Sequence, residues 1–188
     1  MIVLVLKRMK AIACVDMNWA IGKDNKLLFH IPEDMEFFKK MTTNNVVIMG
    51  NNTLKSMGKT LPNRINVVLT SSIKGMMFVT PELIMTDAIA IEDYINSVIE
   101  NTDKDIYIIG GESIYKRYLK RCSELYLTEV FTTVENADAY FPPEDTYTSH
   151  LGYTKLISEG YHDCIKYRIH HYTDNWEGYT DNYSEEYF

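Results

Sequence analysis

Asp34 places a carboxylate on what the sequence predicts to be the apolar face of a helix. With Pro32 as the first helical position, each residue advances by about 100° around the axis. Three apolar residues then share the face of Asp34: Phe37, Phe38 and Met41. An ionised carboxylate among apolar groups is costly without a partner, which suggests a cationic or amidine-like ligand. The competing interpretation is that acidic residues favour the first helical turn because of the macrodipole. The helix alone leaves both open.

Three junctions that follow apolar runs carry residues suited to a phosphate. Gly110-Gly111 precedes a helix predicted to begin near Ser113, and Gly50-Asn51-Asn52-Thr53 repeats this arrangement. Glycines permit close backbone approach, and a following helix offers N–H groups to an anion. A third run, Leu69-Thr70-Ser71-Ser72, adds hydroxyls. Together they indicate a dinucleotide site at the carboxyl ends of parallel strands. Each also fits an ordinary turn, and the sequence has no G-x-G-x-x-G fingerprint.

Metal and covalent chemistry find no support in the sequence. The five histidines form no ligand cluster, and His170 and His171 fall in a predicted strand, where neighbouring side chains point to opposite faces. Cys14 lies in a predicted buried strand, so we interpret it as a core residue rather than a nucleophile. There is no glycine-framed serine elbow.

Apolar strands alternate with helical patterns along most of the chain. The strand predictions are Ala11–Asp16, Val46–Met49, Ile65–Leu69, Asp105–Ile109 and Glu124–Phe131, and the helix predictions are Pro32–Met41, Asn52–Met57, Ala90–Asn101 and Ser113–Cys122. This alternation predicts an α/β fold with a mostly parallel central sheet and helices on both faces. Two further strands, Tyr153–Ser158 and Ile165–Tyr172, flank a turn-rich segment at 159–163 and predict a C-terminal antiparallel hairpin.

Composition bounds the class of protein. The 188 residues predict one domain with a sizeable core, and the net charge of −7 argues against a nucleic-acid groove or an anionic membrane as partner. Three cysteines without a C-x-x-C pair fit a reducing, cytoplasmic setting. The apolar start is too short for a membrane span. We divide the chain into residues 1–8 (an extension, with Met9 as an alternative start, or the beginning of the first strand), a domain over 9–172, and an acidic, tyrosine-rich tail over 173–188. The tail is predicted to be mobile, or to dock its tyrosines on a protein partner or on the body of the protein.

Several ordered motifs resemble those of the dihydrofolate reductases. They are Ala11-Ile12-Ala13-Cys14-Val15-Asp16, Ala20-Ile21-Gly22, Ile31-Pro32-Glu33-Asp34-Met35, Val47-Ile48-Met49-Gly50, Leu61-Pro62, Arg64, Ile109-Gly110-Gly111, Leu125-Tyr126-Leu127-Thr128 and Asp138-Ala139-Tyr140-Phe141-Pro142. They occur in family order and spacing over roughly residues 9–172. The resemblance implies NADPH-dependent reduction of 7,8-dihydrofolate to tetrahydrofolate, in support of one-carbon metabolism, and sensitivity to antifolates such as methotrexate or trimethoprim. Two alternatives stay open: a related reductase of another heterocycle, or a binding module that kept the pocket.

The resemblance also implies roles for the substrate-side residues. Asp34 matches the family's single pterin-pocket carboxylate, and Thr128 matches the hydroxyl that hydrogen-bonds it. Arg64 matches the arginine that grips the glutamate α-carboxylate of folate, a role suited to its planar fork. The other substrate positions are Ile12, Ala13, Met35, Phe38 and Ile109.

For NADPH the resemblance implies a long set of positions. The set is Ala13, Ile21, Gly22, Gly50, Asn51, Asn52, Thr53, Leu69, Thr70, Ser71, Gly110, Gly111, Glu112, Ser113, Ile114 and Tyr115. The stretch 24–29 matches the mobile loop over the nicotinamide.

The chain departs from the family at several of these positions. Asn51 and Asn52 stand where family members often place a cation against the 2′-phosphate of NADPH, and Ser113 stands where an arginine is sometimes found. These departures predict a weaker preference for NADPH over NADH, or a substitute cation at Lys59 or Lys74. Phe29 replaces the usual tryptophan, and Glu112 replaces a third glycine.

Overall fold

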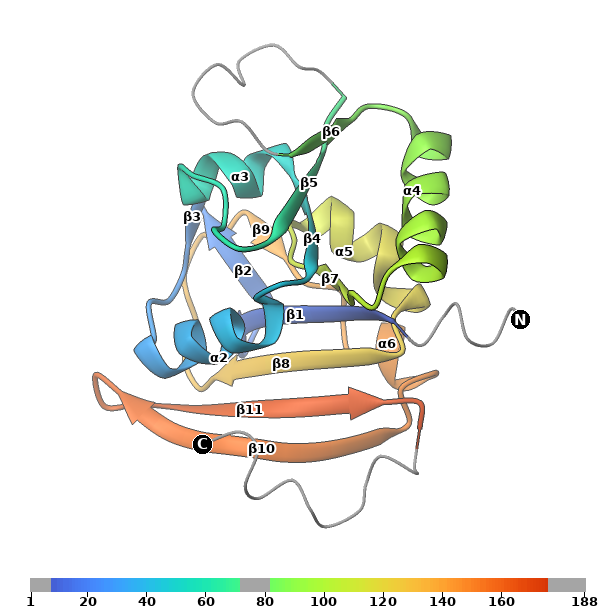
Figure 1. Ribbon diagram of the computed structural model, residues 1–188. Coiled ribbons are helices and arrows are strands. Elements are labelled where there is room, and N and C mark those ends of the chain that lie inside the picture. Colours follow the sequence, from blue (N-terminus) through green and yellow to red (C-terminus); the bar gives the residue numbers. More distant parts are fainter. Residues whose placement is uncertain (1–7, 72–81, 176–188) are drawn as a thin grey trace.

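The centre of the computed structural model is a twisted sheet that runs through the whole molecule (Figure 1). The structure describes residues 8–71 and 82–175. Within these ranges, eight strands lie in the order β10-β11-β8-β1-β7-β4-β5-β6. Their bounds are β1 Met9–Asp16, β4 Val46–Gly50, β5 Ile65–Leu69, β6 Leu83–Met85, β7 Ile106–Ile108, β8 Glu124–Val130, β10 Tyr153–His162 and β11 Ile165–Thr173. The strands from β8 to β6 pair in parallel, and β11 and β10 add an antiparallel edge.

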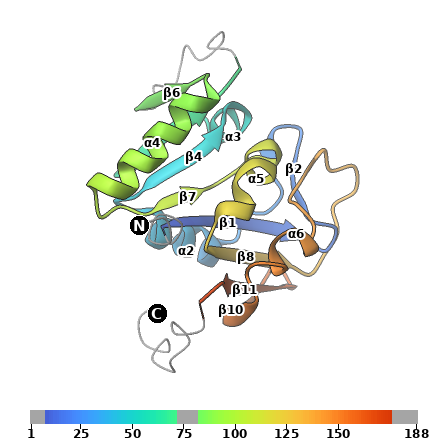
Figure 2. The ribbon, with the colours of Figure 1, turned by 90° about the vertical axis from the view of Figure 1, so that its right-hand side faces the viewer.

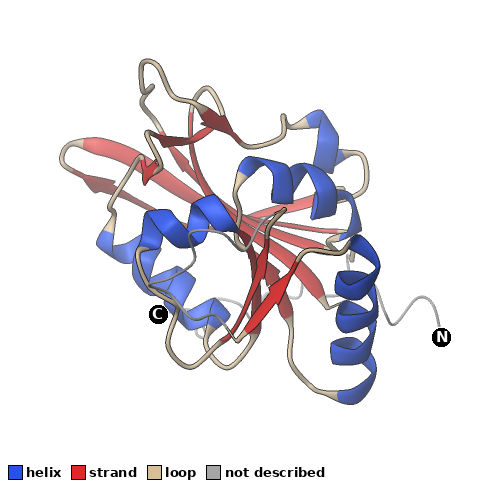
Figure 3. Cartoon of the chain, turned by 90° about the horizontal axis from the view of Figure 1, so that it is seen from above, coloured by secondary structure: helices blue, strands red, loops and turns tan. Residues whose placement is uncertain are grey.

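Helices cover both faces of this sheet, as the nearly continuous apolar strands require. Figure 2 shows α4 (Ala88–Asn101) and α5 (Glu112–Tyr118) in front of the strands and α2 (Pro32–Thr42) behind them. On the α4 side, Ile91 and Ile95 pack in a buried cluster with the β-strand residue Ile48. On the other side, α2 and α3 (Asn51–Met57) contribute Phe37 and Leu54 to a second cluster. The view from above shows the same sandwich of helices around strands (Figure 3). The predicted fold class is confirmed.

A second, three-stranded sheet stands at the carboxyl end of the central strands. It consists of β3 (Lys26–Leu27), β2 (Ala20–Lys23) and β9 (Ala139–Tyr140), in that order. Asp16 anchors the segments that lead into this sheet. Its buried carboxylate accepts hydrogen bonds from the backbone N–H groups of Asn18, Ala20 and Val134 at 2.8–2.9 Å. The turn between β2 and β3 has two residues with positive φ, Asp24 and Asn25. Asp24 also donates its backbone N–H to Asp138 at 2.9 Å.

Several element predictions need correction. The hairpin turn is not at 159–163: β10 continues to His162, and Asp163 and Cys164 with φ of 48° and 65° make a two-residue turn. The predicted helix to Cys122 ends as α5 at Tyr118 and continues as the 3₁₀ turn η1 (Leu119–Arg121). The short elements β2, β3, β6, β9 and α6 (Asp145–Thr148) were not predicted.

The terminal segments are only partly described. Arg8 anchors the start of β1 by donating to the carbonyls of Ile99 and Lys104 at 3.2 and 2.5 Å. Thr173, the first residue of the predicted tail, is buried in β11. The rest of the N-terminal extension, and the tail from residue 176 onward, lie outside the described residues. Among the residues that are described, no helix is long and apolar enough to cross a membrane.

Candidate active site

Asp34 and Thr128 meet between α2 and the central sheet. The Thr128 hydroxyl donates to Asp34 Oδ1 at 2.5 Å, although the two residues lie 94 positions apart in the chain. Thr128 is 2% exposed on β8, and Asp34 is half-buried in the first turn of α2. The helical pattern of the sequence is confirmed here, because Phe37 is buried and Phe38 packs against the same cluster. The apolar face of α2 therefore carries one carboxylate toward β8.

Burial dominates the electrostatics of this carboxylate. Loss of solvent raises the pKa of Asp34, and the hydrogen bond from Thr128 opposes that rise by stabilising the ionised form. Cys14 lies beside Thr128 in the register of β1 and β8. Burial raises the pKa of the Cys14 thiol, and the charge of Asp34 adds to the rise. Cys14 is therefore a neutral thiol close to the carboxylate of Asp34.

Arg64 stands at the opposite end of α2. Its Nε donates to the carbonyl of Pro62 at 2.9 Å, and its Nη1 donates to the hydroxyl of Thr42 at 3.1 Å. Arg64 is 9% exposed, and burial lowers the pKa of its guanidinium. Asp34 and Thr42 are eight residues apart, which is about 12 Å along a helix at about 1.5 Å per residue. A carboxylate and a fixed guanidinium thus mark the two ends of one helix.

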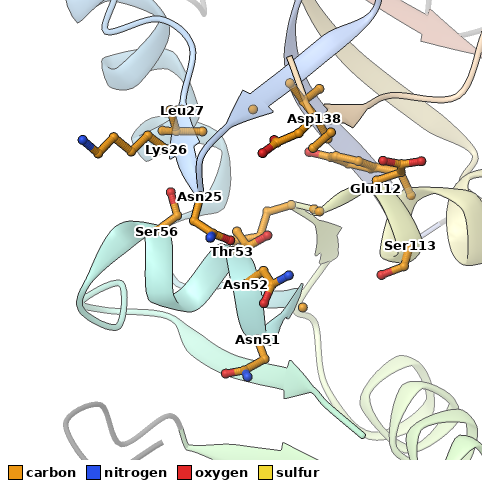
Figure 4. A pocket seen from close by; sticks show the side chains of 18 of the residues that line it. Asn25, Lys26, Leu27, Asn51, Asn52, Thr53, Ser56, Glu112, Ser113 and Asp138 are labelled. Carbon is orange, nitrogen blue, oxygen red and sulfur yellow. The ribbon is translucent and has the colours of Figure 1, made fainter. Parts of the chain in front are cut away.

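A cavity of about 690 Å³ opens between the two sheets and the helices α3 and α5. It extends from Cys14 on β1 and Ile21 on β2 to Leu69, Thr70 and Ser71 at the end of β5. Figure 4 shows that Asn51, Asn52 and Thr53 on α3 lie on one side of it and Asp138 and Glu112 lie on the other. The volume is in the range typical of small-molecule and cofactor sites.

The glycine pair between β7 and α5 forms the wall next to the strands. Gly110 has a φ of +109°, and a Cβ there would lie 3.0 Å from Tyr115 Cε2. A Cβ on Gly111 would lie 3.2 Å from Thr53 Oγ1. Tyr115 in turn donates its hydroxyl to the carbonyl of Ile12 at 2.8 Å, and burial raises the pKa of that phenol. A side chain at either position would crowd Tyr115 or Thr53, so the two glycines keep this part of the wall free of side chains.

The structure brings most of the predicted cofactor positions together and separates a few. The predicted cofactor positions that line the cavity are Ile21, Gly22, Gly50, Asn51, Asn52, Thr53, Leu69, Thr70, Ser71, Gly110, Gly111, Glu112, Ser113 and Tyr115. Ile109, which was predicted on the substrate side, lines it too. Of the two substitute cations that the sequence suggested, Lys59 is exposed and does not line the cavity, and Lys74 lies outside the described residues. Ala13 and Ile114 belong instead to the buried cluster on the α4 and α5 face. On the substrate side, Ile12 is buried beneath α2 and Met35 is 38% exposed on that helix.

Other lining residues were not anticipated. Cys14 packs against the second buried cluster, as expected of a core residue, but it is half-buried and also lines the cavity, which was not expected. Lys23 at the end of β2 is one of them. Asn25, Lys26 and Leu27 also line the cavity and lie in the stretch 24–29 that the resemblance placed over the nicotinamide, but the strands β2 and β3 around them were not predicted. Strands of two to four residues leave too short an alternation to detect. Within 8–71 and 82–175, no group of three or more His, Cys, Asp or Glu could hold a metal ion.

Comparison with known proteins agrees with this geometry. A family model described as dihydrofolate reductase matches residues 8–173. The dihydrofolate reductase of Haemophilus influenzae is 33% identical over 156 residues, which cover 81% of this chain and 92% of that protein. The Bacillus subtilis enzyme is 33% identical over 138 residues, covering 71% of this chain and 75% of the relative.

A solved structure supports the same assignment at the level of the fold. Dihydrofolate reductase from Enterococcus faecalis, complexed with NADP(H) and RAB-propyl, superposes with a TM-score of 0.71 at 28% identity. The similarity covers 89% of this chain and 96% of that one. The chain belongs to the dihydrofolate reductase family, whose members reduce dihydrofolate to tetrahydrofolate with NADPH.

Proposed function

We propose that Asp34 and Thr128 are the catalytic pair with which this chain reduces 7,8-dihydrofolate. The single observation that carries the proposal is the 2.5 Å hydrogen bond between them on the buried face of α2. A carboxylate has two acceptor oxygens, and the pterin N3–H and 2-amino group are two adjacent donors that suit it. Thr128 fixes the orientation of the carboxylate by occupying one lone pair of Oδ1.

The electrostatics of Asp34 suit the protonation that accompanies reduction at pterin C6. Burial makes the charge of Asp34 costly in the free protein, and the amidine-like edge of the pterin favours the charged form. A carboxylate held against that edge raises the basicity of the ring. Protonation of N5 then needs no protein acid in contact with it, and water admitted by the segment 24–29 supplies the proton.

The cavity fits NADPH. The backbone-only wall at Gly110 and Gly111, with the hydroxyl of Thr53 facing it, suits a pyrophosphate approaching closely. Ile21 and Gly22 on β2 line the cavity together with Cys14, which lies beside Thr128 and senses the charge of Asp34, and this part of the cavity suits the nicotinamide. The adenosine half of NADPH then lies against Leu69, Thr70 and Ser71 at the end of β5. NADPH supplies the hydride when bound, and the protein's contribution is to align two flat rings in a cleft that excludes water.

Arg64 is proposed to bind the glutamate tail of the substrate. The separation of about 12 Å between the two ends of α2 is suited to a long ligand that places its ring at Asp34 and its α-carboxylate at Arg64. The two bonds that Arg64 makes to Pro62 and Thr42 hold its guanidinium plane. A fixed fork loses little entropy when it grips a carboxylate.

The bounds of the domain, the binding of antifolates, the cellular location and a partner for the tail are proposed as well. We assign the reductase domain to residues 9–172 and expect antifolates such as methotrexate or trimethoprim to occupy the Asp34 end. A cytoplasmic location remains a prediction from the three cysteines, which are unpaired. A protein partner for the tail remains a prediction too.

The test is spectrophotometric turnover of dihydrofolate with NADPH by the full chain. Methotrexate-sensitive oxidation of NADPH that requires dihydrofolate is expected. Tight binding of both ligands without turnover would instead identify a binding module and overturn the proposal.

A further inference from the structure

We propose that Glu112 is a positioning residue for hydride transfer, because its side chain connects α5 to the small sheet beside the cavity. This inference rests on the proposed function, because it takes the cavity as the NADPH site. It goes beyond that function in giving the side chain of Glu112 a task that a glycine at this position could not perform.

The carboxylate of Glu112 covers the outer edge of β9. In the order β3-β2-β9, the strand β9 has a strand partner on one side only among the described residues. An edge strand leaves backbone donors unpaired unless another group accepts from them. Here the backbone N–H of Tyr140 donates to Glu112 Oε2 at 3.2 Å. A side chain of α5 therefore takes the place of a further strand at this point.

Lys116 holds the carboxylate in this orientation. Its Nζ donates to Glu112 Oε1 at 2.5 Å from one turn further along α5, so the two carboxylate oxygens are divided between the lysine and the strand. The hydrogen bond from Lys116 lowers the pKa of Glu112, and the bond from Tyr140 adds to that effect. The carboxylate is thus ionised at neutral pH, and a charged acceptor makes a hydrogen bond about twice as strong as a neutral one.

The strand that Glu112 contacts is itself bonded to the hairpin of β2 and β3. Tyr140 pairs with Ala20 in the register of β9 and β2. Two residues before Tyr140, Asp138 donates its N–H to the carbonyl of Gly22 at 3.1 Å and accepts the N–H of Asp24 at 2.9 Å. The helix α5 is therefore linked through β9 to the turn of the hairpin.

This hairpin forms one wall of the cavity. Six of its residues line the cavity: Ile21, Gly22, Lys23, Asn25, Lys26 and Leu27. Figure 4 shows Asp138 and Glu112 together on one side of the same space. Because this wall borders the part of the cavity that suits the nicotinamide, its position affects how the ring is aligned for hydride transfer, and misalignment is costly to the rate.

A second contact between α5 and β9 limits the size of the effect. The rings of Tyr115 and Phe141 lie 4.7 Å apart in a T-shaped pair, and both side chains are buried. This pair anchors the chain at the end of β9 that is remote from Asp138. Loss of the Glu112 bond should therefore loosen the wall without detaching it. One hydrogen bond of ordinary strength changes an equilibrium by about two- to tenfold.

The experiment measures backbone amide exchange by NMR and the hydride step in the same variants of the full chain. In Glu112→Ala, the amides of Tyr140 and Asp24 should both exchange about two- to tenfold faster. Single-turnover hydride transfer at saturating NADPH should slow by about two- to tenfold. KM for dihydrofolate should change little, because Asp34 and Arg64 do not contact this wall.

Two further variants separate the bond from other effects of the substitution. Glu112→Gln keeps an oxygen that can accept from Tyr140, so it should recover most of the exchange protection and of the hydride rate. Asp87→Ala is the matched control. It removes an exposed carboxylate that accepts a backbone N–H from Ile89 at 2.9 Å, at the start of α4 and outside the cavity lining. It should change neither measurement.

The possible outcomes distinguish this inference from the proposed function. An unchanged hydride step in Glu112→Ala, or faster exchange at Tyr140 without Asp24, would reduce Glu112 to a local cap and overturn the inference. Equal slowing in Glu112→Gln would overturn it too, because the charge and not the bond would then matter. Absence of turnover in the unmodified chain would count against the proposed function instead, and the exchange rates would still decide whether Glu112 restrains the hairpin.

Discussion

Replacing Asp34 by asparagine should lower activity and leave the folded state as stable or more stable. The side chain is half-buried, and burial raises the pKa of its carboxyl above the ordinary value of 3.8. Stability contributed by such a group is fully present below about pH 3.8 and is lost as the pH rises through the raised pKa. Above that raised pKa the free protein therefore carries an ionised carboxylate at a cost. An amide removes that cost and still accepts the Thr128 bond through Oδ1.

The loss of activity follows from the bonds to the pterin. Asp34 is proposed to accept two hydrogen bonds as a charged group, each worth about 1.5–3 kcal/mol. Losing about 3–6 kcal/mol from the transition state lowers kcat/KM by about two to four orders of magnitude, at about 1.36 kcal/mol per tenfold. The loss should shrink at low pH, where the substrate arrives already protonated.

The assay pairs steady-state kinetics with thermal unfolding of the ligand-free protein across pH. Asp34→Asn should show the large kinetic loss with a Tm at pH 7 equal to or above that of the unmodified protein. Thr128→Val is the matched control. It removes the bond that opposes the pKa rise, so the pH profile set by Asp34 should move to higher pH. Full activity of Asp34→Asn at pH 7, or a marked drop in its Tm, would refute the reasoning.

Three further changes test other parts of the site. Arg64→Lys keeps the charge but loses the fork, so KM for dihydrofolate should rise by about tenfold with kcat little changed; an equal rise for a dihydropterin without a glutamate tail would contradict the assigned role. Gly110→Ala should destabilise the fold by about 1–3 kcal/mol in chemical denaturation because of its φ of +109° and its approach to Tyr115. Gly152→Ala, with nothing within 4 Å and no positive φ, is its control and should unfold like the unmodified protein. A chain ending at Asn175 should retain nearly full kcat/KM, and a loss of activity or of soluble expression would make the tail structural.

Local patterns were sufficient for the long elements. In the predicted helix Ala90–Asn101, the apolar residues Ile91, Ile95, Val98 and Ile99 recur at helical spacing. On α4 the first three are 6% exposed or less, and Ile99 is partly buried against the same cluster. The strand Ile65–Leu69 has the predicted bounds. Apolar periodicity is a property of residues that are close in sequence, so it can be recognised without knowing which elements pack against each other. The two-residue strand β9 escaped detection because its pairing, such as Tyr140 with Ala20, is set by a contact distant in sequence. β3 pairs with the neighbouring β2, but two residues are too few to show an alternation.

The amino-acid sequence was sufficient to place Asp34 on the apolar side of a helix and, through its ordered motifs, to indicate the family. It left open whether that carboxylate was a capping charge or a binding group. The resemblance named Thr128 as the partner of Asp34, but no local pattern did, because the two residues lie 94 positions apart. Their bond and the position of Cys14 at the cavity depend on how β1, β8 and α2 pack together. The physical reason is that burial and strand register depend on the whole chain. A periodic pattern shows which side of an element is covered, whereas the group that covers it is fixed by long-range packing.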